Sequence, residues 1–75
     1  MSKEILNTRR LLCPLPVIRT QDKVKQLQPG DQLEIVGTDP GILQDIPAWC
    51  RVHGHKVIET SSQNHEYRVL IEVGT

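Results

Sequence analysis

The order in which apolar spacing changes along the chain limits its fold more than any other feature. Apolar residues recur twice with helical spacing, and each helical pattern lies between shorter strand-like segments. The pattern predicts strands over residues 5–8, 33–36, 56–60 and 67–73, with helices over 16–27 and 40–53. A turn at 61–64 separates the last two strands. The predicted element order is therefore βαβαββ.

This order predicts how the layers are arranged. Right-handed crossovers place both helices on the same face of the sheet, while the last two strands form a hairpin and make the sheet mixed. Arg68 and Glu72 alternate with apolar residues in the last strand, which indicates that the other sheet face meets solvent. We expect an α/β (α+β) fold, a two-layer βαβαββ sandwich with a four-stranded mixed sheet and two helices on one face. The pattern leaves the strand order open.

Length and composition agree with one small domain spanning residues 1–75. Of the 75 residues 28 are apolar, and half of these are Val or Ile, which favours a fold that contains a sheet. The formal net charge is zero and aromatic residues are few, which argues against direct nucleic-acid binding. The sequence has neither an apolar signal segment near residue 1 nor about 18 consecutive apolar residues. We expect a cytoplasmic monomer that binds no membrane.

The second predicted helix has one awkward residue. Asp39 is expected to cap it, with Pro40 at its first position, and Gly54 is expected to end it. Pro47 either bends this helix or delays its start until after Ile46. The predicted apolar stripe contains Ile42, Leu43, Ile46, Trp49, Cys50 and Val52.

Cys13 is the most informative position for chemistry. It stands just before a predicted helix whose first turn contains Pro14 and Pro16, so free backbone amides and the helix dipole are expected to favour a thiolate. Three nearby arginines, Arg9, Arg10 and Arg19, would add positive potential. The alternative is that Cys13 has only a structural role as a small buried side chain, as free cysteines commonly do.

The other candidate residues point to little chemistry. The three histidines lie far from Cys13 along the chain and form no Cys-His signature, so transfer of a group between sulfurs is favoured over hydrolysis. Cys50 lies on the apolar stripe of the second predicted helix, so we expect it to pack in the core. A redox pair with Cys13 would need the two Cα atoms within about 7 Å. His53 and His55 are too few for a metal site, and we expect no metal.

Four short motifs resemble one known family. Cys13-Pro14-Leu15-Pro16 resembles the Cys-Pro-x-Pro motif of the TusA-like (SirA-like) sulfur carriers. Similar later landmarks follow in the family's order: Gln28-Pro29-Gly30-Asp31, Thr38-Asp39-Pro40 and Asp45-Ile46-Pro47-Ala48-Trp49-Cys50. The resemblance spans nearly the whole chain and implies the two-layer βαβαββ fold.

The resemblance also implies a function. In this family the motif cysteine, here Cys13, accepts a sulfane sulfur as a persulfide from a protein donor such as a cysteine desulfurase or rhodanese. It then passes the sulfur to an acceptor protein, with no organic cofactor, as a carrier rather than a stand-alone turnover enzyme. Donor and acceptor decide between tRNA thiolation, cofactor synthesis, sulfur oxidation and selenium handling.

Residues around Cys13 carry subsidiary expectations. Pro14 and Pro16 would hold the helix end toward the thiol, and Arg19 would contact a docked partner. The family usually has Asp-x-x-Gly-x-x-Cys where this chain has Asn7 and Arg10. Arg10 would need a non-glycine backbone geometry at that turn, or its charge would stabilise a persulfide anion. A different class, a binding or regulatory module with a structural Cys13, predicts that Cys13→Ser leaves function intact.

Overall fold

The structure is a computed structural model that describes residues 3–74 of the chain. Its elements are β1 (Lys3–Thr8), α1 (Leu15–Val24), β2 (Gln32–Gly37), α2 (Ile42–His53), β3 (Lys56–Gln63) and β4 (Glu66–Glu72). The predicted order βαβαββ is confirmed.

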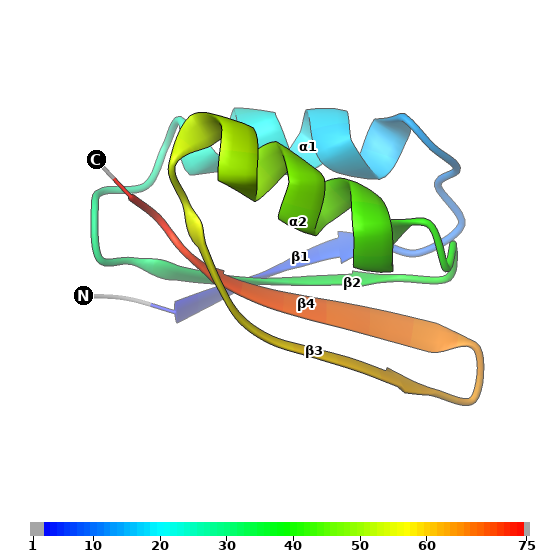
Figure 1. Cartoon of the computed structure of the whole chain (residues 1–75). Helices are drawn as coiled ribbons and strands as arrows, with labels where there is room; N and C mark the ends of the chain where they lie inside the picture. Colours follow the sequence, from blue (N-terminus) through cyan, green and yellow to red (C-terminus); the bar gives the residue numbers. More distant parts are fainter. Residues whose placement is uncertain (1–2, 75) are drawn as a thin grey trace.

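The four strands form one mixed sheet. The strand order, which the sequence left open, is β1-β2-β4-β3. β1 and β2 are parallel, whereas β4 is antiparallel to both β2 and β3. Figure 1 shows α1 and α2 side by side on the same face of this sheet. The predicted two-layer sandwich is confirmed.

The core lies between the helices and the sheet. It is built from aliphatic side chains of β2, β4 and α2, and its fully buried members are Leu33, Ile35, Ile42, Ile46, Cys50, Val69 and Ile71. The alternation predicted for β4 holds, because Val69 and Ile71 are buried, whereas Arg68 before them is exposed and Leu70 between them is half-buried. Val52 was expected in the stripe but is 78% exposed. It lies six residues after Ile46, about 240° round the helix, and so points away from the core.

Both helices differ from prediction at their ends. α1 stops at Val24, and the next residues continue in tighter turns in which the Gln26 and Leu27 amides donate to carbonyls three residues back. α2 begins at Ile42 rather than Pro40, and Gly41 is its capping residue. Asp39 thus lies two residues before the cap position, but the bond expected of it is present, because its Oδ1 accepts from the Gly41 amide at 2.9 Å.

Pro47 lies inside a continuous α2, so the alternative in which this helix starts only after Ile46 is wrong. The helix packs closely enough on the sheet to tolerate the lost hydrogen bond, since Ile46 and Cys50 on either side are buried. Gly54 ends α2 as expected: it has a φ of 79° and its amide donates to the Cys50 carbonyl.

The turn expected at 61–64 is wrong, because β3 continues to Gln63 and the turn is Asn64 and His65 alone. Both turn residues have positive φ, 52° and 63°, as a two-residue hairpin turn requires. Residues 61–63 are exposed polar residues that pair with β4 by backbone only. Their side chains therefore carry no apolar alternation from which a strand is recognised.

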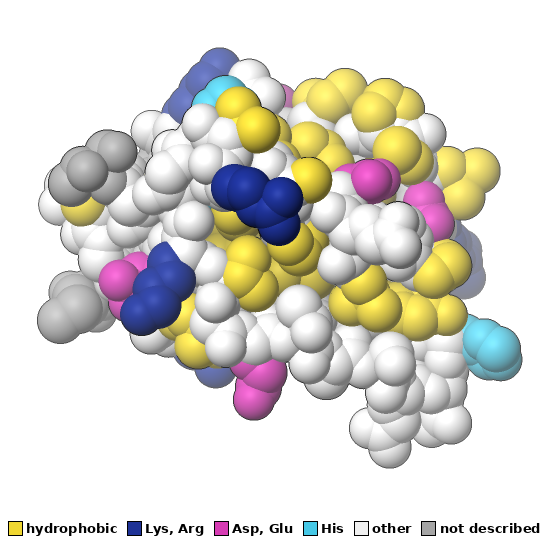
Figure 2. All heavy atoms as spheres, in the orientation of Figure 1, with side chains coloured by type: hydrophobic (Ala, Val, Ile, Leu, Met, Phe, Trp, Pro, Cys, Tyr) yellow, Lys and Arg dark blue, Asp and Glu magenta, His cyan; other side chains and the backbone are white. Residues whose placement is uncertain are grey.

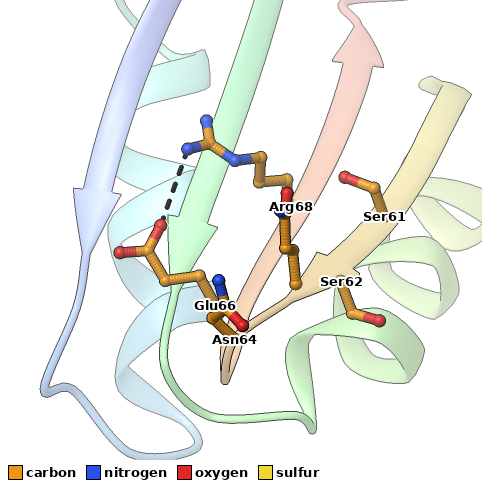
Figure 3. Close-up of a pocket in the computed structure, with 6 residues that line it drawn as sticks. Ser61, Ser62, Asn64, Glu66 and Arg68 are labelled. Carbon is orange, nitrogen blue, oxygen red and sulfur yellow. Dashed lines mark ion pairs between the residues drawn. The ribbon is translucent and has the colours of Figure 1, made fainter.

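The uncovered sheet face carries a chain of ion pairs. Glu34 pairs with both Lys3 and Arg68, at 3.9 and 2.7 Å, and Glu66 pairs with both Arg68 and Arg9, at 3.5 and 3.0 Å. At the hairpin end these charges border a polar hollow of about 410 Å³ lined by Ser61, Ser62, Gln63, Asn64, Glu66 and Arg68 (Figure 3). In the described residues neither helix is long and apolar enough to cross a membrane.

Candidate functional site

Sheet topology brings two loops together at one corner. Because β1 and β2 are parallel neighbours, the chain leaves both strands at the same edge of the sheet. The loop after β1 carries Arg10 and Cys13, and the loop after β2 carries Thr38 and Asp39. Backbone amides join them: Arg10 donates to Thr38 Oγ1 at 2.9 Å, and Cys13 donates to Asp39 Oδ2 at 3.0 Å. Asp39 thus links the cysteine loop to the start of α2.

The Cys13 thiol is exposed and faces a carboxylate. Its Sγ donates a hydrogen bond to Asp45 Oδ2 at 3.1 Å, and Asp45 lies in the first turn of α2. The pKa of Cys13 is raised above its ordinary value, first by this hydrogen bond, then by desolvation and by the negative charges of Asp45 and Asp39. The expectation of a lowered pKa is therefore wrong.

The start of α1 explains why it does not favour a thiolate. The helix begins at Leu15, after a cis peptide bond between Cys13 and Pro14. The Leu15 amide donates to the Leu12 carbonyl at 2.8 Å, and Pro16 has no amide hydrogen. The Leu15 amide is thus engaged and the two prolines supply none, while Asp45 and Asp39 place negative charge beside the thiol.

Arg10 keeps the backbone conformation that a glycine would supply. Its φ is 68°, so the expected non-glycine geometry is wrong, and the bond to Thr38 helps to hold this strained conformation. Asn7 Oδ1 accepts from the Arg9 amide at 2.9 Å, a bond that an aspartate oxygen would also make. Arg10 and Asn7 thus each take part in one hydrogen bond that holds this loop.

The three arginines near Cys13 in sequence are not equivalent. Arg9 makes two hydrogen bonds to Glu66, which raise the pKa of Arg9 and lower that of Glu66. Its charge is therefore directed to the hairpin instead of the thiol. The side chains of Arg10 and Arg19 are exposed and make no ion pair within residues 3–74.

Exposed apolar side chains lie close to Cys13 in the sequence. Leu12 is 71% exposed, Leu15 41% and Ile18 46%, and all three lie within five residues of Cys13. Figure 2 shows hydrophobic side chains gathered at the upper right of the molecule, over the start of α1, with acidic side chains beside them. A group of exposed apolar side chains suits contact with another protein.

The remaining candidates are packed into the fold. Cys50 is 1% exposed in the core, and burial raises the pKa of its thiol to about 11. Neither cysteine is in a disulfide. At the other end of α2 the rings of His53 and His55 stand 5.0 and 4.8 Å from Trp49, and His55 Nδ1 accepts from the Gly74 amide at 2.9 Å.

Asp45 is the site residue that sequence reasoning missed. It entered only as part of a family landmark, with no role of its own. One signal was available: an acidic residue in the first turn of a helix that follows the parallel neighbour of the cysteine-bearing strand. The loops after such strands share one edge, so the carboxylate and the thiol lie close enough to meet.

Comparisons with known proteins agree with this fold. The family model described as Sulfurtransferase TusA matches residues 4–73. Sulfur carrier proteins TusA of Pseudomonas aeruginosa and Pseudomonas paraeruginosa are each 38% identical over 63 residues, which cover 84% of this chain and 80% of theirs. The crystal structure of a SirA-like protein from Desulfitobacterium hafniense superposes with a TM-score of 0.83 at 20% identity, covering 96% of this chain and 99% of that one.

Proposed function

The chain belongs to the TusA family, and from this premise we propose that it carries sulfur between proteins as a persulfide on Cys13. Relatives named as sulfur carriers support the general role. The observation that carries the assignment to Cys13 is its position: an exposed thiol whose backbone is fixed by Asp39, while the other thiol is buried.

The proposed reaction moves one sulfur atom without outside oxidant. The Cys13 thiol gives up its proton, and Sγ attacks the sulfane sulfur of the donor's persulfide. A new bond forms between Sγ and that sulfur, while the donor's own sulfur–sulfur bond breaks and its electron pair stays on the donor cysteine as a thiolate. Cys13 ends at the persulfide level and the donor cysteine at the thiol level. Attack by an acceptor thiol on the carried sulfur repeats the step.

The surroundings of Cys13 suit protein partners. Leu12, Leu15 and Ile18 are exposed apolar residues within five positions of Cys13, and Arg19 lies on the same helix as Leu15. We propose a cysteine desulfurase or a rhodanese as donor and another protein as acceptor. No organic cofactor enters this scheme, and the chain is expected to act as a cytoplasmic monomer.

Intact-protein mass spectrometry tests the proposal. The wild type and the variants Cys13→Ser and Cys50→Ser are incubated with a cysteine desulfurase and cysteine, and in parallel with a rhodanese and thiosulfate. We expect a gain of one sulfur atom that a reductant removes, present in Cys50→Ser and lost in Cys13→Ser. Absence of the gain with both donors would contradict the carrier role and favour the binding module.

A further inference from the structure

Two carboxylates approach Cys13 from one side, and they matter differently in the two states of the carrier. Asp45 on α2 accepts a hydrogen bond from Cys13 Sγ at 3.1 Å, and Asp39 in the preceding loop accepts one from the Cys13 amide at 3.0 Å. Of the arginines nearest in sequence, Arg9 pairs with Glu66, whereas Arg10 and Arg19 are exposed and make no ion pair within the described residues. Both hydrogen bonds of Cys13 to side chains are thus with negative groups.

In the unloaded protein these groups favour the neutral thiol. A carboxylate accepts a hydrogen bond from S–H, but it repels a thiolate at the same distance. Ionisation therefore breaks a hydrogen bond and places two negative charges side by side. This arrangement stabilises the empty carrier in its protonated form.

The loaded protein meets the opposite situation. A persulfide is more acidic than the thiol from which it forms, so the carried sulfur bears a negative charge at a pH where the empty thiol does not. The hydrogen bond to Asp45 Oδ2 is then lost, and the anion lies beside Asp45 and Asp39. The carboxylates thus stabilise the empty state relative to the loaded one.

We propose that Asp45, supported by Asp39, biases Cys13 toward giving its sulfur away. This inference rests on the proposed function and adds a role for the α2 carboxylate within it. The carrier holds sulfur weakly, and the carried sulfur passes more readily to any acceptor that lacks such a carboxylate beside its thiol. Asp45 acts on the reacting sulfur directly through the contact at 3.1 Å.

Asp45→Asn is the variant that tests this role, because it removes the charge and keeps the shape of the side chain. Asp45 is half-buried and its side chain accepts a hydrogen bond from Cys13, so the substitution leaves the core untouched. Asp22→Asn makes the same change at an exposed position of α1, seven residues after the helix start and about 10 Å along its axis. All variants carry Cys50→Ser, so that Cys13 is the one thiol.

The first measurement is the rate of alkylation of the unloaded variants by iodoacetamide as a function of pH. Asp45→Asn is expected to move the midpoint of the profile to lower pH and to raise the rate at pH 7 about fivefold, the effect of one unit charge at about 4 Å in water. Asp22→Asn should follow the parent profile. Asp39 accepts from the Cys13 amide and makes no hydrogen bond with Sγ. Asp39→Asn should therefore shift the midpoint of the alkylation profile less.

The second measurement is the loading equilibrium with inorganic polysulfide, read as the mass gain of one sulfur atom. In this reaction Cys13 takes a sulfane sulfur, and the shortened polysulfide keeps the electron pair. The ratio of loaded to empty Asp45→Asn is expected to exceed that of the parent by about fivefold for the same electrostatic reason. Equal loading of Asp45→Asn and parent would overturn the inference, even with a shifted alkylation profile.

Failure of the proposed function looks different. If the parent takes up no sulfur from polysulfide, desulfurase or rhodanese, the carrier role is wrong, and the proposed effect of Asp45 on loading is wrong with it. If parent and Asp45→Asn both load, and to the same extent, the carrier role stands and the role of Asp45 falls. Circular dichroism of each variant confirms that the compared proteins are folded.

Discussion

The two thiols of the chain differ in their surroundings, although both involve α2. Cys13 meets the first turn of α2 from outside, exposed and hydrogen-bonded to Asp45, whereas Cys50 lies on the buried side of α2 at 1% exposure. Both have a raised pKa, but for different causes: a carboxylate for Cys13 and burial for Cys50. A raised pKa alone therefore does not separate a reactive cysteine from a structural one, and access does.

The largest expected difference between the two thiols is their accessibility in the native protein. We expect iodoacetamide to modify Cys13 at least about 1,000-fold faster than Cys50, because Cys50 reacts only from open states whose population is set by stability. Alkylation followed by peptide mass spectrometry measures both rates in one sample. Comparable rates in the native protein would show that the core around Cys50 opens easily, and both rates should converge in denaturant.

The next difference concerns alkaline pH. Burial raises the pKa of Cys50 to about 11, above its unfolded value, so its contribution to stability is complete below the unfolded pKa and is lost as pH rises through the folded one. Between about pH 9 and 11 the free energy of unfolding should fall on the order of 2 kcal/mol more in the wild type than in Cys50→Val. Urea titrations across this pH range measure it.

Cys13→Ser serves as the control for the alkaline experiment. Cys13 is exposed, so this variant should retain most of the alkaline loss of stability seen in the wild type. A loss that disappears in Cys13→Ser and persists in Cys50→Val would reverse the assignment of the two thiols.

The smallest difference is expected between two glycines, Gly37 against buried residues and Gly41 beside the two carboxylates. A Cβ at Gly37 would stand 2.7 Å from Thr8 Oγ1, which is buried and donates to the Val36 carbonyl, so Gly37→Ala should cost about 1 kcal/mol. A Cβ at Gly41 would stand 3.3 Å from Asp39 Oδ1 and 3.5 Å from Asp45 Oδ2. Gly41→Ala should change the free energy of unfolding by no more than about 0.5 kcal/mol, but it should alter the pH profile of Cys13 alkylation. The reverse pattern would contradict the placement of the carboxylates.

The sequence predicted the layers better than it predicted the charge at the site. Apolar spacing was sufficient for the sandwich, because Val69 and Ile71 on β4 and Ile42 and Ile46 on α2 are buried by the same periodicity that identifies their elements. The extent of β3 was missed because residues 61–63 are polar and pair through backbone alone.

The surroundings of Cys13 were missed for a different reason. The residues near Cys13 in sequence are prolines and arginines, and these alone predict a positive setting. The groups that contact it come from the neighbouring loop and helix, and contacts of that kind depend on the pairing of β1 with β2.

The contacts of Cys13 span long stretches of chain: 26 residues separate it from Asp39 and 32 from Asp45. A short peptide that carries only the Cys-Pro-x-Pro segment contains neither carboxylate, so its thiol would titrate as an ordinary one. The pair of contacts forms only when the crossover from β1 through α1 to β2 has closed and α2 has docked. The acidity of one surface thiol therefore reports the folding of the whole βαβα unit, and transplanting the motif without that unit would transplant the cysteine but not its chemistry.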